Sequence, residues 1–126
     1  MIRYFDDNRN RPARAIQIWL ILIGLASNRQ TITYQELSKV LGFKGEGVFA
    51  DILGHIAFYC KENELPSLTD LVVKKDTGLP GDGLATQVIN FNAERERVYN
   101  HKWFRMFPPT VDELAASFKR GKAALT

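Results

Sequence analysis

The sequence predicts a mainly helical fold with a small β wing, a winged helix-turn-helix that carries additional helices at its N- and C-terminal ends. Three successive patterns predict it: a capped helix in TITYQELSKVLG, a second helix that opens at GEGVFADILGHI, and a basic strand with a glycine-rich turn in LVVKKDTGLPGDG. Two helices joined by a short turn and followed by a hairpin are the parts of that fold.

Size and composition limit the chain to one core. It has 126 residues, of which 45% are hydrophobic and 25% are charged, which is enough to bury one core of ordinary size. We therefore expect a single domain over residues 1–120 and a flexible tail over residues 121–126. The net charge of +3 permits a polyanionic partner but does not require one, because many basic proteins have none.

The single cysteine and the short apolar runs exclude several classes of protein. Cys60 has no second cysteine for an internal disulfide or a multi-cysteine metal site, and we expect no metal and no cofactor. The longest apolar run, IWLILIGLA, is far shorter than the roughly 20 residues of a membrane span. No export signal is recognisable, so the sequence predicts a cytoplasmic protein.

The N-terminal helix is predicted over residues 13–26. Pro12 suits the first turn of a helix, where its missing N–H is not needed, and Gly24 is the only helix breaker that follows. Apolar residues cover most of the circumference, so this helix should pack against other elements on more than one side.

The next two helices form the helix-turn-helix. Thr33 and Glu36 have the spacing of a capping box, which predicts a helix over residues 34–41, and Gly42 suits the left-handed residue that ends it. The turn FKGEG leads to a helix predicted from residue 47 to about residue 63, on which apolar residues recur at spacings of three and four.

The wing and two more helices complete the prediction. Residues 68–75 have the alternating, β-branched character of a strand, residues 76–83 supply a turn, and residues 87–91 return as the partner strand. Asn92 is predicted to cap a charged helix over AERERVYNHKWF, with Phe104 facing inward. A second capping box, Thr110 with Glu113, begins the last helix over residues 111–120.

The segments TITYQELSKVLG and NELPSLTDLVVKKDTGLPGDG resemble the C-terminal DNA-binding domain of alkylguanine-DNA alkyltransferases and of alkyltransferase-like proteins. The resemblance covers the middle part of the chain and implies a winged-helix fold that binds DNA. It also implies that Tyr34 contacts a phosphate of a flipped nucleotide. The same segments are similar to a group of small bacterial or phage proteins.

The reactive motif of that family is missing from this chain. It should fall between Leu68 and Val73, where the alignment places either Thr69 or Leu71 at the nucleophile position, and neither is a cysteine. Alkyl transfer needs a thiolate activated by a neighbouring base, so we expect no alkyltransferase activity. The arginine with which the family enters the helical stack is also missing near Val48.

The candidate nucleic-acid surface joins the wing to the start of the second helix of the motif, which in a winged helix usually enters the major groove. Glycines there would let the backbone approach DNA, lysines would neutralise phosphates, and a tyrosine hydroxyl would bind one. The residues are Tyr34, Lys44, Gly45, Gly47, Lys74 and Lys75. Glu46 and Asp51 on the same helix would repel DNA.

Further basic residues have two interpretations. They either extend the phosphate-contacting surface or are ordinary solvated charges, since Arg95 and Arg97 alternate with Glu94 and Glu96 and can pair with them on one helix. These residues are Arg29, Lys39, Arg95, Arg97, Lys102 and Arg105.

Three side chains are candidates for chemistry, and packing explains each of them as well. Cys60 lies on an apolar stripe, His55 is separated from it by more than one helical turn, and His101 sits among aromatic residues. The sequence therefore predicts a non-catalytic protein that binds double-stranded DNA mainly through phosphates. The alternative is a protein-interaction module, such as a phage or host-defence factor, and an enzyme that uses Cys60 and His55 is the third possibility.

Overall fold

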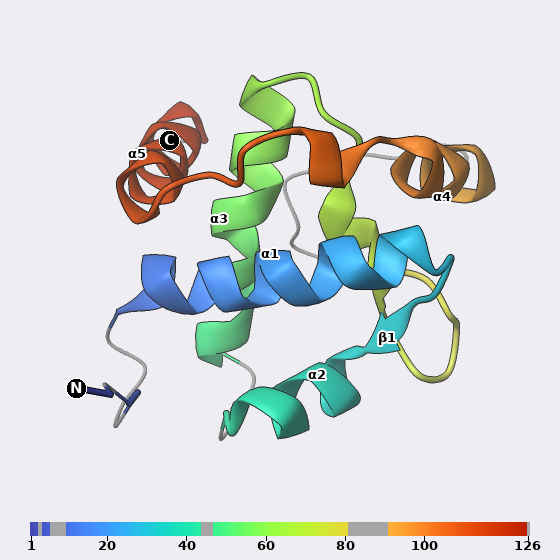
Figure 1. The fold of residues 1–126 in the computed structure, drawn as a ribbon, viewed down its shortest axis with the longest axis horizontal. Helices are drawn as coiled ribbons and strands as arrows, with labels where there is room; N and C mark the ends of the chain where they lie inside the picture. The colour runs from blue at the N-terminus through green and yellow to red at the C-terminus, as the bar shows by residue number, and fades with distance from the viewer. Residues whose placement is uncertain (3, 6–9, 44–46, 81–90, 126) are drawn as a thin grey trace.

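The computed structural model describes residues 1, 2, 4, 5, 10–43, 47–80 and 91–125, with only the backbone of residues 47 and 48. The fold is mainly helical with a small two-stranded parallel sheet (Figure 1). The elements are α1 (Arg11–Ser27), β1 (Ile32–Thr33), α2 (Tyr34–Leu41), α3 (Gly47–Glu62), the 3-10 helix η1 (Leu68–Leu71), β2 (Val72–Val73), α4 (Phe91–Asn100), the 3-10 helix η2 (Trp103–Arg105) and α5 (Val111–Ala124).

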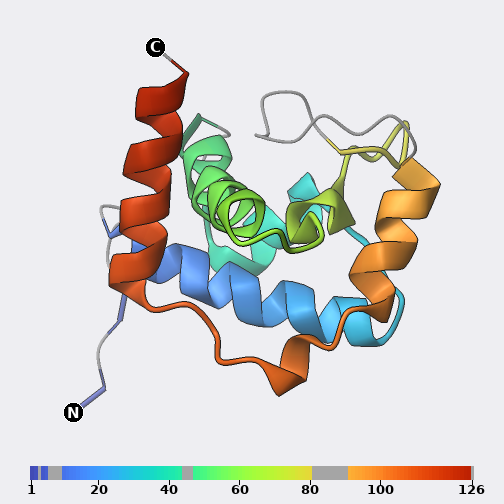
Figure 2. The same ribbon diagram turned by 90° about the horizontal axis from the view of Figure 1, so that it is seen from above.

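Helix α3 runs through the middle of the molecule and is covered by other helices. Seen from above, α3 is viewed along its axis, with α5 on one side and α4 on the other, while α1 crosses the group (Figure 2). Helix α1 contacts α3, α4, α5 and both 3-10 helices. The prediction that α1 packs on more than one side is therefore confirmed.

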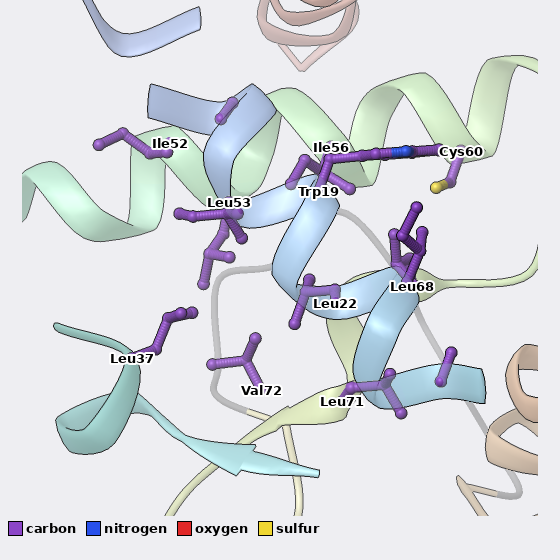
Figure 3. Close-up of a cluster of buried hydrophobic side chains, with 14 of the residues drawn as sticks. Trp19, Leu22, Leu37, Ile52, Leu53, Ile56, Cys60, Leu68, Leu71 and Val72 are labelled. Atoms are coloured by element: carbon purple, nitrogen blue, oxygen red, sulfur yellow. The ribbon is translucent and has the colours of Figure 1, made fainter. Parts of the chain in front are cut away.

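Side chains from α1, α2, α3, η1 and β2 meet in one hydrophobic core (Figure 3). Trp19 of α1 makes edge-to-face contacts with Tyr59 and Trp103, with ring centroids 5.8 and 5.6 Å apart. Such aromatic pairs add to the stabilisation that comes from removing apolar surface from water. Around them lie Leu22, Leu37, Ile52, Leu53, Ile56, Cys60, Leu68, Leu71 and Val72.

The helices up to α3 follow the sequence signals closely. Asn10 caps α1, because its side chain accepts a hydrogen bond from the backbone N–H of Ala13. Helix α2 has the predicted bounds, both halves of the Thr33 and Glu36 capping box are formed, and Gly42 is left-handed with a φ of 73°. Helix α3 begins at the predicted residue and ends one residue earlier than expected.

The wing differs from the predicted hairpin. Residues 68–71 form η1 instead of a strand. All four residues are buried, so the alternation of apolar and polar residues that predicted a half-buried strand does not correspond to one buried and one exposed face. Strand β2 pairs in parallel with β1, and an antiparallel bridge joins Val73 to Pro80. Residues 74–80, called the 74–80 loop below, are closed by a hydrogen bond from the Lys74 N–H to the Leu79 carbonyl. Residues 87–90 of the predicted return strand lie outside the described residues, and residue 91 begins α4.

The C-terminal part also departs from the prediction at three points. Helix α4 begins at Phe91, before the predicted cap Asn92, and ends at residue 100. Phe104, which was expected to face inward, is 68% exposed on η2. The Thr110 and Glu113 capping box is formed as predicted, but α5 continues to residue 124 instead of ending at residue 120.

Candidate nucleic-acid interface

The parallel sheet brings two of the predicted contact residues to the same edge. Thr33 lies opposite Val73 in the register of β1 and β2. Because the strands are parallel, the residues that follow them, Tyr34 and Lys74, leave the sheet at the same end. Tyr34 begins α2 and Lys74 begins the 74–80 loop.

Lys75, which follows Lys74, lies close to the first turn of α2. The pKa of Glu36 is lowered first by hydrogen bonds from Thr33 and, further, by the charge of Lys75. Lys75 is exposed, so its ammonium group is available to solvent and to a ligand at this edge.

Tyr34 links this edge to the first turn of α3. Its half-buried ring makes an edge-to-face contact with Phe49, with centroids 5.9 Å apart, and Phe49 in turn contacts Phe43 at 5.5 Å. The start of α3 at Gly47 therefore lies beside Tyr34. Lys44 and Gly45 fall outside the described residues.

Between its first turn and its last residues, α3 has no exposed face that could contact the bases of a DNA groove. Ala50 is exposed, but residues 52–58 are buried between α1 and α5. A helix that is apolar around most of its circumference is packed on several sides. Lying lengthwise in a major groove is therefore excluded for α3, whose described side chains are exposed only at the two ends of the helix, at Ala50 and at Lys61 and Glu62.

The charges along this edge have both signs. Asp51, which was expected to repel DNA, forms a salt bridge with Arg11 of α1 at 2.5 Å. Glu36 and Asp76 are exposed next to Lys39 and Lys75. The described part of the edge is therefore not a continuous positive surface.

Three of the surrounding arginines interact within the protein. Arg29 forms a salt bridge with Glu96, and its guanidinium lies 4.8 Å from the centre of the Tyr99 ring. Arg97 pairs with Glu94 at 2.8 Å, one turn earlier on α4. The predicted pairing with a glutamate on the same helix is confirmed for Arg97, whereas Arg29 pairs with a glutamate of a distant segment, which was not predicted.

The third arginine, Arg95, makes a contact that neither interpretation of the sequence predicted. Arg95 donates a hydrogen bond to the carbonyl of Gly78 at 2.9 Å, which ties α4 to the 74–80 loop. Lys39, Lys102 and Arg105 are exposed.

Sequence reasoning also missed Arg14, a buried cation that holds the N-terminal arm. Its guanidinium lies 4.6 Å from the ring centres of both Phe5 and Phe43, and it donates hydrogen bonds to the Leu41 carbonyl and to Gln17. Burial lowers the pKa of Arg14. The sequence signal that could have identified Arg14 was its position within an otherwise apolar helix, because a cation that is buried there needs partners.

The candidate chemical groups face different elements, and Cys60 and His55 are buried while His101 is half-buried. Cys60 is 1% exposed in the core, and burial raises the pKa of its thiol to about 12. His55 stacks on Phe118 of α5, while His101 contacts Trp103. Thr69, one of the two positions aligned with the family's nucleophile, is fully buried.

The described residues contain neither a candidate metal-binding cluster nor a candidate membrane-spanning helix. Among those residues, no three His, Cys, Asp or Glu side chains are grouped so that they could hold a metal ion. None of the helices in the described ranges is both long and apolar enough to cross a membrane. Neither protein-family models, nor curated proteins, nor solved structures give a match to this chain.

Proposed function

We propose that the protein binds double-stranded DNA without catalysis, mainly through phosphates, at the edge formed by Tyr34, the start of α3, Lys74 and Lys75. The observation that carries the proposal is the register of the sheet. Thr33 opposite Val73 places Tyr34 and Lys74 side by side, although they are far apart in the sequence.

The chemistry of this edge suits a phosphate backbone better than base edges. Lys75 is an exposed cation, and a tyrosine hydroxyl donates a hydrogen bond to a phosphate oxygen. Helix α3 reaches the edge by its N-terminal end, where the helix dipole favours an anion. Contacts of this kind fix the position of a protein on a duplex without reading its sequence.

The test is the affinity for a short fluorescently labelled DNA duplex, measured by anisotropy at several salt concentrations. Lys74→Glu/Lys75→Glu should weaken binding and reduce the slope of log affinity against log salt by about two, because each phosphate contact contributes about one. The matched control is Lys61→Glu/Lys119→Glu, which makes the same charge change on exposed residues of α3 and α5 away from this edge. Equal losses in both variants, or no loss in the first, would contradict the proposal.

A single-residue test addresses the tyrosine. Tyr34→Phe removes the hydroxyl and keeps the ring that contacts Phe49. We expect weaker duplex binding, by roughly threefold to tenfold for one lost hydrogen bond, and urea unfolding of the same variant measures any separate change in stability. An unchanged affinity would remove Tyr34 from the interface.

The mixed charge of the same edge favours a second candidate, a protein-interaction module. Glu36 and Asp76 beside Lys39 and Lys75 match the alternating charges of a protein surface better than a uniform polyanion. Capture experiments with and without nuclease separate the two. A partner protein that is retained after nuclease treatment and lost in Lys74→Glu/Lys75→Glu supports this candidate over DNA binding.

A further inference from the structure

The connection between α4 and α5 exposes two aromatic rings beside two cations. Phe104 is 68% exposed and Phe107 is 94% exposed, and both Lys102 and Arg105 are exposed. No aspartate or glutamate occurs in the sequence between Glu96 and Asp112. Residues 102–107, called the aromatic turn below, therefore combine unburied phenyl rings with a local excess of positive charge.

The aromatic turn is held firmly by the residues between and beside the exposed rings. Trp103 is 3% exposed, its Nε1 donates to the Val98 carbonyl at 2.8 Å, and its ring packs edge-on against Trp19. Met106 is half-buried against the core and Pro109 is buried. Exposed rings on such a fixed turn lose little conformational freedom when they bind a ligand.

The aromatic turn is separate from the proposed duplex-binding edge. In Figure 1 the connection between α4 and α5 runs along the top of α1, while α2 lies below α1. A ligand on the aromatic turn therefore does not compete for Tyr34 or for the 74–80 loop.

We propose that the aromatic turn binds single-stranded nucleic acid, with bases stacked on Phe104 and Phe107 and phosphates paired with Lys102 and Arg105. Single-strand sites combine exposed aromatic rings, on which successive bases stack, with cations that follow the backbone. Duplex DNA hides the faces of its bases, so the rings select unpaired nucleotides. The two phenyl rings are separated by Arg105 and half-buried Met106, and this alternation of ring and cation fits a strand better than it fits an apolar protein groove.

The test measures binding of labelled oligothymidylate, which forms no stem, by fluorescence anisotropy. Phe104→Leu/Phe107→Leu keeps apolar side chains but removes the aromatic faces, and we expect affinity to fall roughly tenfold or more. Phe104→Tyr/Phe107→Tyr keeps the faces and should bind within about twofold of wild type. Because both rings are exposed, the midpoint of urea unfolding should stay the same in both variants.

The binding of the two variants separates stacking from other modes of binding. Loss of binding in the leucine variant together with retention in the tyrosine variant supports stacking. No binding by wild type, or equal binding by wild type and the leucine variant, overturns the proposal.

The same variants keep this proposal distinct from the duplex-binding function. Lys74→Glu/Lys75→Glu should weaken duplex binding and leave oligothymidylate binding unchanged, while the leucine variant should do the reverse. If wild type binds only the duplex, the aromatic turn is not a nucleic-acid site; if it binds only the oligothymidylate, the duplex-binding edge is wrong.

Discussion

The imidazole of His55 lies parallel to the phenyl ring of Phe118, with the ring centroids 4.1 Å apart and the planes inclined by 3°. The Nδ1 atom of His55 donates a hydrogen bond to the backbone carbonyl of Asp51 at 2.7 Å, which fixes the tautomer of the neutral ring. This stack is a central contact between α3 and α5. The neutral state of His55 is favoured because burial lowers its pKa, although the hydrogen bond to Asp51 and the charge of Asp51 oppose this shift.

Protonation of His55 should weaken the attachment of α5. Since the pKa of His55 is lower in the folded chain than in the unfolded chain, the unfolded chain takes up the proton first as the pH falls below about 6.5, and the free energy of unfolding decreases. The charge of Arg11 also opposes a positive charge on His55. Urea unfolding at a series of pH values between 7 and 5 measures the effect.

The control variant for this pH dependence is His55→Gln, which has no charge at any pH and keeps a donor for the Asp51 carbonyl. Its stability should fall less between pH 7 and 5 than that of wild type. His101 remains in the variant, and the pKa of this residue is also lowered by burial, so part of the dependence should persist. The pKa values of Glu36 and Glu62 are lowered as well, but these two residues reduce the free energy of unfolding only as the pH falls toward and below 4.5, the ordinary pKa of glutamate. Identical profiles for the two proteins would contradict the prediction.

Close packing at the end of α5 gives a second prediction. A Cβ atom on Gly121 would overlap the ring of Phe58, which is buried on α3. Gly121→Ala should therefore destabilise the protein by about 1–3 kcal/mol, although alanine is the better helix former. Equilibrium urea unfolding measures the difference.

Gly24 of α1 supplies the matched control. A Cβ atom there would have no neighbour within 4 Å, and the residue lies within a helix. Gly24→Ala should stabilise the protein by about 0.5–1 kcal/mol through helix propensity alone. The same chemical change should thus have opposite signs at the two positions, and a gain of stability at Gly121 would show that α5 does not pack on Phe58 in solution.

The parts of the fold that the sequence predicted depend on residues within one helical turn of each other. Thr33 with Glu36, Thr110 with Glu113, and Gly42 each mark a helix end through local hydrogen bonds or a single φ angle, and all of them are confirmed. Local signals of this kind do not depend on what packs against the helix.

The features that were missed depend on contacts between distant segments. The parallel pairing of residues 32–33 with residues 72–73 joins two segments that are separated in the sequence by α2 and α3. Arg14 gave a weak signal and Arg95 gave none, because their partners Phe43 and Gly78 lie on other elements. In the candidate site, Tyr34 and Lys74 follow the two paired strands at the same end of the sheet. The burial of α3 depends on α5, whose docking no local pattern indicates.

Cys60 provides a third prediction, on thiol reactivity. The thiol is 1% exposed and its pKa is raised to about 12, so the thiolate is scarce at neutral pH. A disulfide reagent that absorbs on reaction should leave the folded protein unmodified and should titrate one thiol per chain in denaturant. Rapid modification of the folded protein would show that the core around Cys60 opens under native conditions.

The two capping boxes give a last prediction that separates stability from binding. Thr33→Ala and Thr110→Ala each remove a hydroxyl that accepts a hydrogen bond from the N–H three residues later, at 3.1 Å in both cases. Each variant should lose about 1 kcal/mol of stability in urea unfolding. Thr33 immediately precedes Tyr34 and lies in β1, whose pairing with β2 brings Tyr34 close to Lys74. Thr33→Ala should therefore also weaken duplex binding. Thr110 caps α5, away from that edge, so Thr110→Ala should bind the duplex as wild type does. Equal duplex affinity in both variants would show that the start of α2 is not part of the proposed interface.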